Sequence, residues 1–426
     1  MLEDGLQAIA SKKPIKGVKN VSCLHGMEWF DVVYGLVPDY MHGVLLGITK
    51  QILQLLFSSK NSKHAFFLGD RIGDIDAILK KMLPTDDISR LPRKMEKNLH
   101  HLKASELEMW LIFYSIPCLI DFMKPAFLNH LALLVEGIYI LLGNDITEHK
   151  LNRAETVLLE FYALFADFYG YESCTLNLHN VCQHLVMYVR KLGPLWAWSC
   201  FVFEDMNGSL LDYAHGTGDV CLQILWTVQA QKRLAVDAQY INNHFLKGYV
   251  QKMVKAGRSV TIKLEAKNCK VAGGLKSLVL TEDIRNKLQQ LLDISEQEPL
   301  GKVFKVLRVV IGDTVFFSKE YVRMKKRIVH TVLTKDDNIH IATINYFIYH
   351  SNSDQCFAVV HKLEMSENPL LHPLINHLIC LKKANDQSDE KYIISVDKIK
   401  EKLLVLNGNK NYSCICRLPN PYALSV

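Results

Sequence analysis

The stretch GLVPDYMHGVLLGITKQIL, residues 35–53, decides how the first half of the chain folds. After Pro38, apolar residues recur at three- and four-residue steps, which is the period of an amphipathic helix. Asp39 stands directly before this pattern, where an aspartate commonly accepts a backbone N–H of the first helical turn. His42 follows on that first turn. The stretch therefore predicts a capped helix, with a functional alternative in which the Asp39 carboxylate orients an imidazole that acts on a phosphate or substrate oxygen.

The helical period continues to about residue 255 and then gives way to a strand pattern. Further helices are expected near 64–83, 104–122, 126–143, 150–169, 177–192, 200–212, 218–233 and 237–254. After these, β-branched and aromatic runs separated by short polar turns predict antiparallel strands, as in NIHIATINYFIYHS, residues 338–351. We therefore expect an α+β protein whose parts are an irregular basic lead-in (1–30), a helical region (31–260), a basic linker (261–289) and a small all-β barrel or sandwich (290–426).

Composition limits the class of protein. Of the 426 residues, 49% are hydrophobic and 22% are charged, which is ordinary for a globular protein. The net charge of +6 permits a nucleic-acid partner without requiring one. Eleven cysteines without a regular framework, together with the lack of an apolar N-terminal segment, predict reduced thiols in an intracellular compartment. The longest apolar runs carry acids or a proline, so no membrane partner is expected.

Two groups of residues after position 170 have metal-binding chemistry. Glu204 ends the apolar run WAWSCFVFE, residues 196–204, and is expected to be partly buried. It is either an acid favoured by the start of a helix or a ligand for a divalent cation. Cys174, His179, Cys182 and His184 are zinc-ligand types. His184 follows His179 by five residues and is expected to point elsewhere, so the spacing favours half-buried helix histidines over a zinc site.

Basic residues gather in three stretches. The candidate DNA-binding residues in the first two are Lys252, Lys255, Arg258, Lys263, Arg323, Lys325, Lys326 and Arg327. The third holds Arg90, Arg93, Lys94, Lys97 and Lys103. Such runs are commonly only solvated faces, but three on one mildly basic chain keep contact with a phosphate backbone open. No Walker loop, nucleophile elbow, Cys-x-x-Cys pair or zinc-finger spacing is present.

Three segments taken together resemble the En/Spm-like (CACTA) DNA transposases, a family of DDE transposases. GVKNVSCLHGMEWFDVVYGLVPDYMHGVLLGITKQIL (17–53) is similar to the segment around that family's Asp-x-x-His motif. HLKASELEMWLIFYSIPCLI (101–120) is similar to the helical segment that follows it. The third segment, from about 176 to 224, is similar to the family's stretch of paired histidines, Gly-Pro and a Phe-x-Phe-Glu acid. The three occur in the family's order, and the resemblance covers roughly residues 15–235.

The resemblance implies a ribonuclease-H-like core in which three acids hold two Mg²⁺ ions for attack on a phosphodiester. Glu204 matches the third acid, a catalytic residue and metal ligand. Asp39 and His42 match the Asp-x-x-His pair in the helical insertion before it. The resemblance therefore implies that the Asp39–His42 pair both caps a helix and supports catalysis. A nuclear protein with DNA as its partner is also implied.

The departure from the family is as informative as the match. The family's first two catalytic aspartates precede the Asp-x-x-His segment, whereas the lead-in before Asp39 shows neither alternating strands nor the family's Cys-x-x-Cys pairs. One glutamate cannot hold two cations, so we expect no stable Mg²⁺ binding and no catalysis by this chain alone. The resulting hypothesis is a truncated, transposase-derived protein that still binds DNA, and a homo-oligomer stays open.

The alternative hypothesis is a non-enzymatic interaction or chromatin-associated module. Its binding face would be formed by strand aromatics of the C-terminal β region, which could dock a peptide or a chromatin tail. The available residues are Tyr346, Phe347, Tyr349 and Phe357. Core packing is the commoner use of aromatic side chains on strands, so their exposure discriminates between the two uses.

Overall fold

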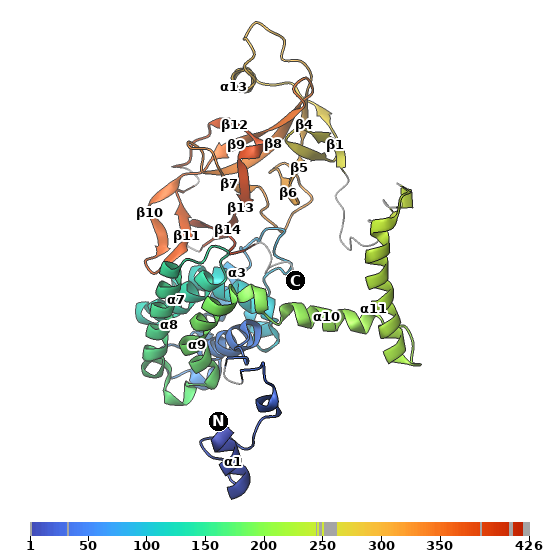
Figure 1. Ribbon diagram of the computed structural model, residues 1–426. Coiled ribbons are helices and arrows are strands. Elements are labelled where there is room, and N and C mark those ends of the chain that lie inside the picture. Colours follow the sequence, from blue (N-terminus) through green and yellow to red (C-terminus); the bar gives the residue numbers. More distant parts are fainter. Residues whose placement is uncertain are drawn as a thin grey trace.

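The computed structural model describes residues 2–31, 34–243, 245–246, 249–250, 262–383, 386–408 and 412–420. Figure 1 shows α3, α7, α8 and α9 gathered in one body and most of the strands in another that sits directly against it, while α1, α10, α11 and α13 lie outside the helical body. All the strand pairs are antiparallel. The expected α+β class is therefore confirmed, with the helices preceding most of the strands along the chain.

The helical body begins at the stretch 35–53. Its helices are η2 (Tyr40–Thr49), α2 (Lys50–Phe57), α3 (Ile72–Leu79), α4 (Met95–Asn98), α5 (Ala104–Met109), η6 (Trp110–Tyr114), α6 (Ser115–Leu119), α7 (Pro125–Leu141), α8 (Glu148–Tyr169) and α9 (Leu176–Leu192). The hydroxyls of Thr147 and Thr175 accept backbone N–H groups at the starts of α8 and α9. Gly170 ends α8 at φ 88°, a left-handed conformation that glycine adopts without a steric cost.

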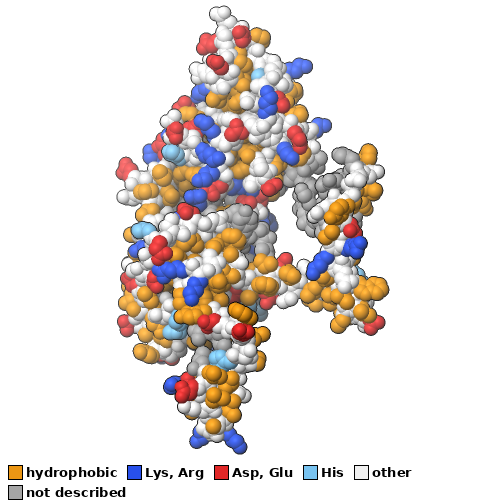
Figure 2. Space-filling view, in the orientation of Figure 1, with side chains coloured by type: hydrophobic (Ala, Val, Ile, Leu, Met, Phe, Trp, Pro, Cys, Tyr) orange, Lys and Arg blue, Asp and Glu red, His pale blue; other side chains and the backbone are white. Residues whose placement is uncertain are grey.

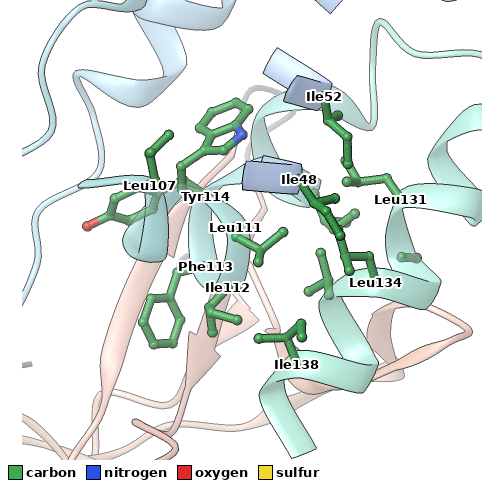
Figure 3. Packing of buried hydrophobic residues seen from close by; sticks show 14 of the residues in the cluster. Ile48, Ile52, Leu107, Leu111, Ile112, Phe113, Tyr114, Leu131, Leu134 and Ile138 are labelled. Atoms are coloured by element: carbon green, nitrogen blue, oxygen red, sulfur yellow. The ribbon is translucent and has the colours of Figure 1, made fainter. Parts of the chain in front are cut away.

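Helix η2 is π-helical and lies deep in this body. Figure 3 shows Ile48 and Ile52 on the same side as Leu131 and Leu134 of α7, in one apolar layer. Gly47 lets α9 approach closely, because a Cβ at this position would lie 2.8 Å from the Asn177 side chain. The end of η2 and the beginning of α2 are therefore held in place by packing against α7 and α9.

The strand body contains three open sheets. One joins β12 (Lys391–Ser395), β9 (Gln355–Lys362), β8 (Ile341–His350), β4 (Val303–Val306) and β3 (Lys276–Ser277), with β7 (Thr331–Thr334) and β13 (Ile399–Lys402) attached. The second has the order β1 (Ile262–Ala266), β2 (Cys269–Ala272), β5 (Arg308–Ile311), β6 (Thr314–Phe317). The third has the order β10 (Met365–His372), β11 (Ile375–Leu381), β15 (Ser413–Cys416), β14 (Leu404–Asn407). Within the described residues, no sheet closes into the expected barrel.

The third sheet shares a hydrophobic core with the helices. Ile375, Leu378, Leu404 and Leu406 belong to the same buried cluster as the α7 and α8 side chains. Polar contacts cross the same boundary: the buried Lys402 ammonium lies 2.6 Å from an Asp86 carboxylate oxygen, and other crossing bonds run from Asn376 to Glu136 and from Tyr412 to the Pro117 carbonyl. The two bodies are therefore one packed unit.

Two expectations about segments are corrected. The lead-in 1–30 is not wholly irregular, since α1 (Leu2–Ser11) buries Gly5 and Ala8. The stretch 261–289, expected as a linker, instead holds β1, β2, β3 and most of α13 (Glu282–Leu292), because its alternating apolar residues pair in sheets. The end of the helix expected over 237–254 lies outside the described residues. In the part of the chain that the structure describes, no helix combines the length and apolarity needed to cross a bilayer.

Two helices extend away from the helical body as an arm. They are α10 (Phe201–Asp212) and α11 (Val220–Asp237), and neither contains a buried residue among those described. Figure 1 shows α10 leading outward and α11 turning along the side of the molecule. Figure 2 shows hydrophobic side chains gathered on this arm, and Phe203 and Trp226 are 62% and 70% exposed.

Candidate functional site

The Asp39 carboxylate joins two segments that are far apart in the sequence. Its Oδ2 accepts the His42 backbone N–H at 2.8 Å, which caps η2. Its Oδ1 accepts the Cys200 N–H at 2.8 Å, at the residue directly before α10. One carboxylate thus caps two helices, and it fixes the start of the arm that carries Glu204 to the start of η2.

His42 completes this arrangement. Its Nδ1 lies 2.7 Å from Asp39 Oδ2, so the carboxylate orients the imidazole as the functional alternative expects. The His42 side chain is 53% exposed, whereas that of Asp39 is 15% exposed. The imidazole is therefore accessible to a ligand while its orienting group is held largely within the protein.

The electrostatics of the site follow from its N–H donors. Partial burial alone would raise the pKa of Asp39, but the N–H groups of Cys200 and His42 outweigh this effect and lower that pKa below its ordinary value. Burial, followed by the negative charge of Asp39, raises the pKa of the Cys200 thiol. At neutral pH the Asp39 carboxyl group is therefore ionised and the Cys200 thiol is protonated.

Cys200 is the site residue that sequence reasoning missed. Ligand atoms of Asp39, His42 and Cys200 lie within 4.8 Å of one another, and this is the one such group of three or more His, Cys, Asp or Glu residues in the described part of the chain. The signal in the sequence was weak, because Cys200 is only one of eleven scattered cysteines. Its role depends on a contact with a residue 161 positions away.

Glu204 follows Cys200 by four residues, but its side chain is not in the environment that the sequence predicted. It lies on the first turn of α10, and its N–H donates to the Cys200 carbonyl at 2.9 Å. The side chain is exposed, so the expected partial burial is wrong: Trp198 and Phe201 of the apolar run pack against the core, but Val202 and Phe203 next to Glu204 are exposed on the arm. No second acid joins Glu204 in a metal-ligand group among the described residues.

The candidate zinc residues on α9 also differ from expectation. His179 and His184 do not diverge, because their Nε2 atoms lie 3.1 Å apart. Cys182 is buried, and Cys174 is exposed before the helix begins. These four residues form no metal-ligand group in the described part of the chain.

A buried pair lies next to the site on the inner side of η2. The Tyr40 hydroxyl donates to Glu108 Oε1 at 3.0 Å, and both residues are buried. Burial raises the pKa of Glu108 to about 8, against the opposing effect of the Tyr40 hydrogen bond. Glu108 is thus mainly protonated at neutral pH, so a neutral acid supports the first turn of η2.

The candidate DNA-binding residues fall into three groups. Lys252, Lys255 and Arg258 lie outside the described residues, and Lys263 is exposed on β1. Arg323, Lys325 and Lys326 are exposed on the connection between β6 and β7. Arg327 is different: its guanidinium donates to the carbonyls of Thr85, Ile88 and Ser89.

Arg327 therefore has a structural role, which corrects its assignment as a DNA contact. Its bonds hold the 323–327 segment against residues 84–89, and the Ile328 N–H adds a bond to the Pro84 carbonyl. Two basic stretches more than 200 residues apart in sequence meet at this point. Their exposed cations that form no salt bridge with another described residue are Arg90, Lys94, Lys97, Lys103, Arg323, Lys325 and Lys326, which we call the basic surface.

The strand aromatics lie mostly in the core. Phe347, Phe357 and Tyr349 are buried, and Tyr346 is only partly exposed. Core packing therefore accounts for three of the four residues, and they do not form an open docking face.

Comparisons with protein-family models, with curated proteins and with solved structures found no match to this chain. The resemblance to the CACTA transposases therefore stays a prediction that rests on the sequence segments quoted above.

Proposed function

We propose that this chain is a transposase-derived, nuclear protein that binds DNA through the basic surface and does not cut DNA by itself. The observation that carries DNA binding is the contact of Arg327 with the carbonyls of residues 85–89, which brings two separate basic stretches together. Exposed cations without carboxylate partners are available to phosphates, and neutralising phosphates releases counterions from DNA.

The Asp39 contacts support the transposase resemblance. Two segments that resemble separate family motifs meet at this carboxylate, with Cys200 N at 2.8 Å and His42 Nδ1 at 2.7 Å. A chance similarity of two unrelated segments gives no reason for such a contact. The ribonuclease-H-like origin of these helices is part of this proposal.

The proposed lack of catalysis rests on the surroundings of Glu204. Two-metal chemistry needs several acids that bridge both cations. Glu204 is exposed, and no further carboxylate joins it in a metal-ligand group within the described residues. Mg²⁺, the cofactor of the intact family, is therefore proposed not to bind stably here.

A second copy of the chain is the protein partner we propose for the arm. The arm exposes large apolar side chains, and contiguous apolar surface of this kind marks protein–protein contacts. Its charges have both signs, with Asp205 and Asp212 on α10 and Lys232 and Arg233 on α11, so self-association meets no single-sign repulsion. Sedimentation of the full chain and of Trp226→Glu tests this: the variant should sediment as a smaller species.

The experiment that tests the proposed function uses the purified full chain with labelled duplex DNA and Mg²⁺. We expect retention of DNA at ~50 mM salt, where backbone contacts are strongest, and no cleavage or strand transfer. Absence of retention under this condition overturns DNA binding. Cleavage that is lost in Glu204→Gln overturns the claim that the chain is inactive by itself.

A further inference from the structure

We infer that Asp39, His42 and Cys200 form a binding site for one Zn²⁺ ion, which clamps the arm to helix η2. The three residues supply an oxygen, a nitrogen and a sulfur ligand from two segments far apart in the sequence, with the ligand atoms within 4.8 Å of one another. This inference does not depend on DNA binding. It also differs from the all-acid Mg²⁺ site that the family resemblance implies.

The present hydrogen bonds show how a cation fits. The Asp39 carboxylate is hydrogen bonded to the His42 imidazole, and the Cys200 sulfur lies within 4.8 Å of the other two ligand atoms. Zn²⁺ takes the place of the hydrogen that the imidazole directs at the carboxylate. On binding, the imidazole proton moves from Nδ1 to Nε2 and the thiol proton passes to solvent, so that neutral imidazole, thiolate and carboxylate hold the metal with release of one proton.

Distances allow this exchange with small movements. Zinc bonds of about 2.0–2.3 Å place tetrahedral ligand atoms roughly 3.3–3.8 Å apart. The observed separations are no larger than 4.8 Å, and the His42 and Cys200 side chains are not enclosed by the core. Rotations of these two side chains therefore bring the ligands to zinc distances without moving either helix.

The choice of metal follows from the donor set. Thiolate and imidazole favour Zn²⁺ or Co²⁺, whereas Mg²⁺ prefers oxygen ligands alone. Three protein ligands leave a fourth position for water or for Glu204, which lies one helical turn after Cys200 on the same face of α10. The exposure of His42 keeps this fourth position open to solvent.

Electrostatics decide whether a cation is tolerated at two helix starts. Each helix N-terminus is equivalent to about half a positive charge, so η2 and α10 together oppose the ion with about one charge. The Asp39 carboxylate and the Cys200 thiolate supply two negative charges, and Glu204 adds a third nearby. The local balance therefore favours a divalent cation once the thiol has lost its proton.

A bound ion would have a mechanical effect on the arm. Helix α10 has no buried residue among those described, and the Asp39–Cys200 bond is its polar link to η2. Metal bonds from residues on both sides of this link make it much harder to open. Zinc should therefore slow proteolysis within the arm and leave cleavage elsewhere unchanged.

The test is titration of the metal-free full chain with Co²⁺, followed by displacement with Zn²⁺. Wild type should bind one equivalent of Co²⁺ with the charge-transfer absorption of a cobalt–thiolate bond, which Zn²⁺ abolishes. Cys200→Ser should lose this absorption, and His42→Gln should weaken binding at least tenfold. Cys221→Ser, which removes an exposed thiol on α11, is the matched control and should behave as wild type.

Circular dichroism of each metal-free variant establishes that it is folded before titration. The inference is overturned if folded wild type shows no thiolate absorption at one equivalent. It is equally overturned if Cys200→Ser keeps the absorption, or if His42→Gln binds as tightly as wild type.

Discussion

Replacement of Asp39 by alanine tests the double cap directly. The change removes acceptors for the Cys200 and His42 N–H groups, each bonded at 2.8 Å. Loss of a helix cap costs about 1 kcal/mol, and loss of a charge beside a helix N-terminus costs about 0.3–1 kcal/mol. With two helices affected, we expect the free energy of unfolding to fall by about 3 kcal/mol. Asp39→Asn keeps one acceptor oxygen and should lose about half as much.

The assay is urea unfolding followed by circular dichroism, with Asp205→Ala on the exposed face of α10 as the matched control. The control should lie within about 0.5 kcal/mol of wild type. Because the folded-state pKa of Asp39 is lowered, its ionised form is the stabilising one. Its contribution is present above the unfolded pKa of about 3.9 and is lost as the pH falls through the lower folded pKa.

The stability difference between wild type and Asp39→Asn should therefore shrink as the pH is lowered from 6 toward 3. A loss below about 0.5 kcal/mol in Asp39→Ala, or a difference that stays constant over this pH range, refutes the double-cap reasoning.

Three further predictions concern the interior and the boundary between the two bodies. Burial raises the folded pKa of Glu108 to about 8 from 4.5, so the free energy of unfolding of wild type should fall as the pH rises from 5 to 8. In urea unfolding at pH 8, Glu108→Gln should be more stable than wild type by on the order of 3–4 kcal/mol. Equal pH slopes for the two proteins contradict this prediction. Lys402→Met leaves the largely buried Asp86 without its cation, so the free energy of unfolding should fall by about 3 kcal/mol. The surface control Lys398→Met should lower it by at most about 1 kcal/mol. Equal effects of the two substitutions contradict the role of the buried pair. Arg327→Ala should lower the melting temperature, because it removes the bonds that hold the 323–327 segment against residues 85–89; an unchanged melting temperature contradicts this structural role.

Local patterns predicted most of the elements. The helical period placed η2, α7, α8 and α9 to within a few residues, and strand runs predicted β8 and β9, because these patterns reflect which face of an element is buried. The stretch 261–289 was assigned as a linker because it is rich in lysine, although the sequence SVTIKLEA, residues 259–266, alternates in the manner of a strand. Lys263 on β1 and Lys270 on β2 are exposed, so charge alone did not distinguish a linker from a strand.

The features of the site that could not be predicted from the sequence depend on contacts between residues far apart in the chain. Asp39 and His42 are three residues apart, and their interaction was predicted from helix capping. Cys200 joins them only through the fold, as does the contact of Arg327 with residues 85–89. Glu204 was expected to be partly buried because apolar neighbours usually indicate a core, but Val202 and Phe203 next to it are exposed on the arm.

The central claim, that the basic surface contacts a DNA backbone, is tested most directly by the dependence of DNA affinity on salt concentration. The full chain and the triple variant Arg323→Ala, Lys325→Ala, Lys326→Ala should be compared on one duplex. Each lost phosphate contact reduces the slope of log K against log salt by about 0.9, so three contacts reduce it by about 3. A wild-type slope that is steeper than that of the triple variant by this amount supports the account. Equal slopes contradict it.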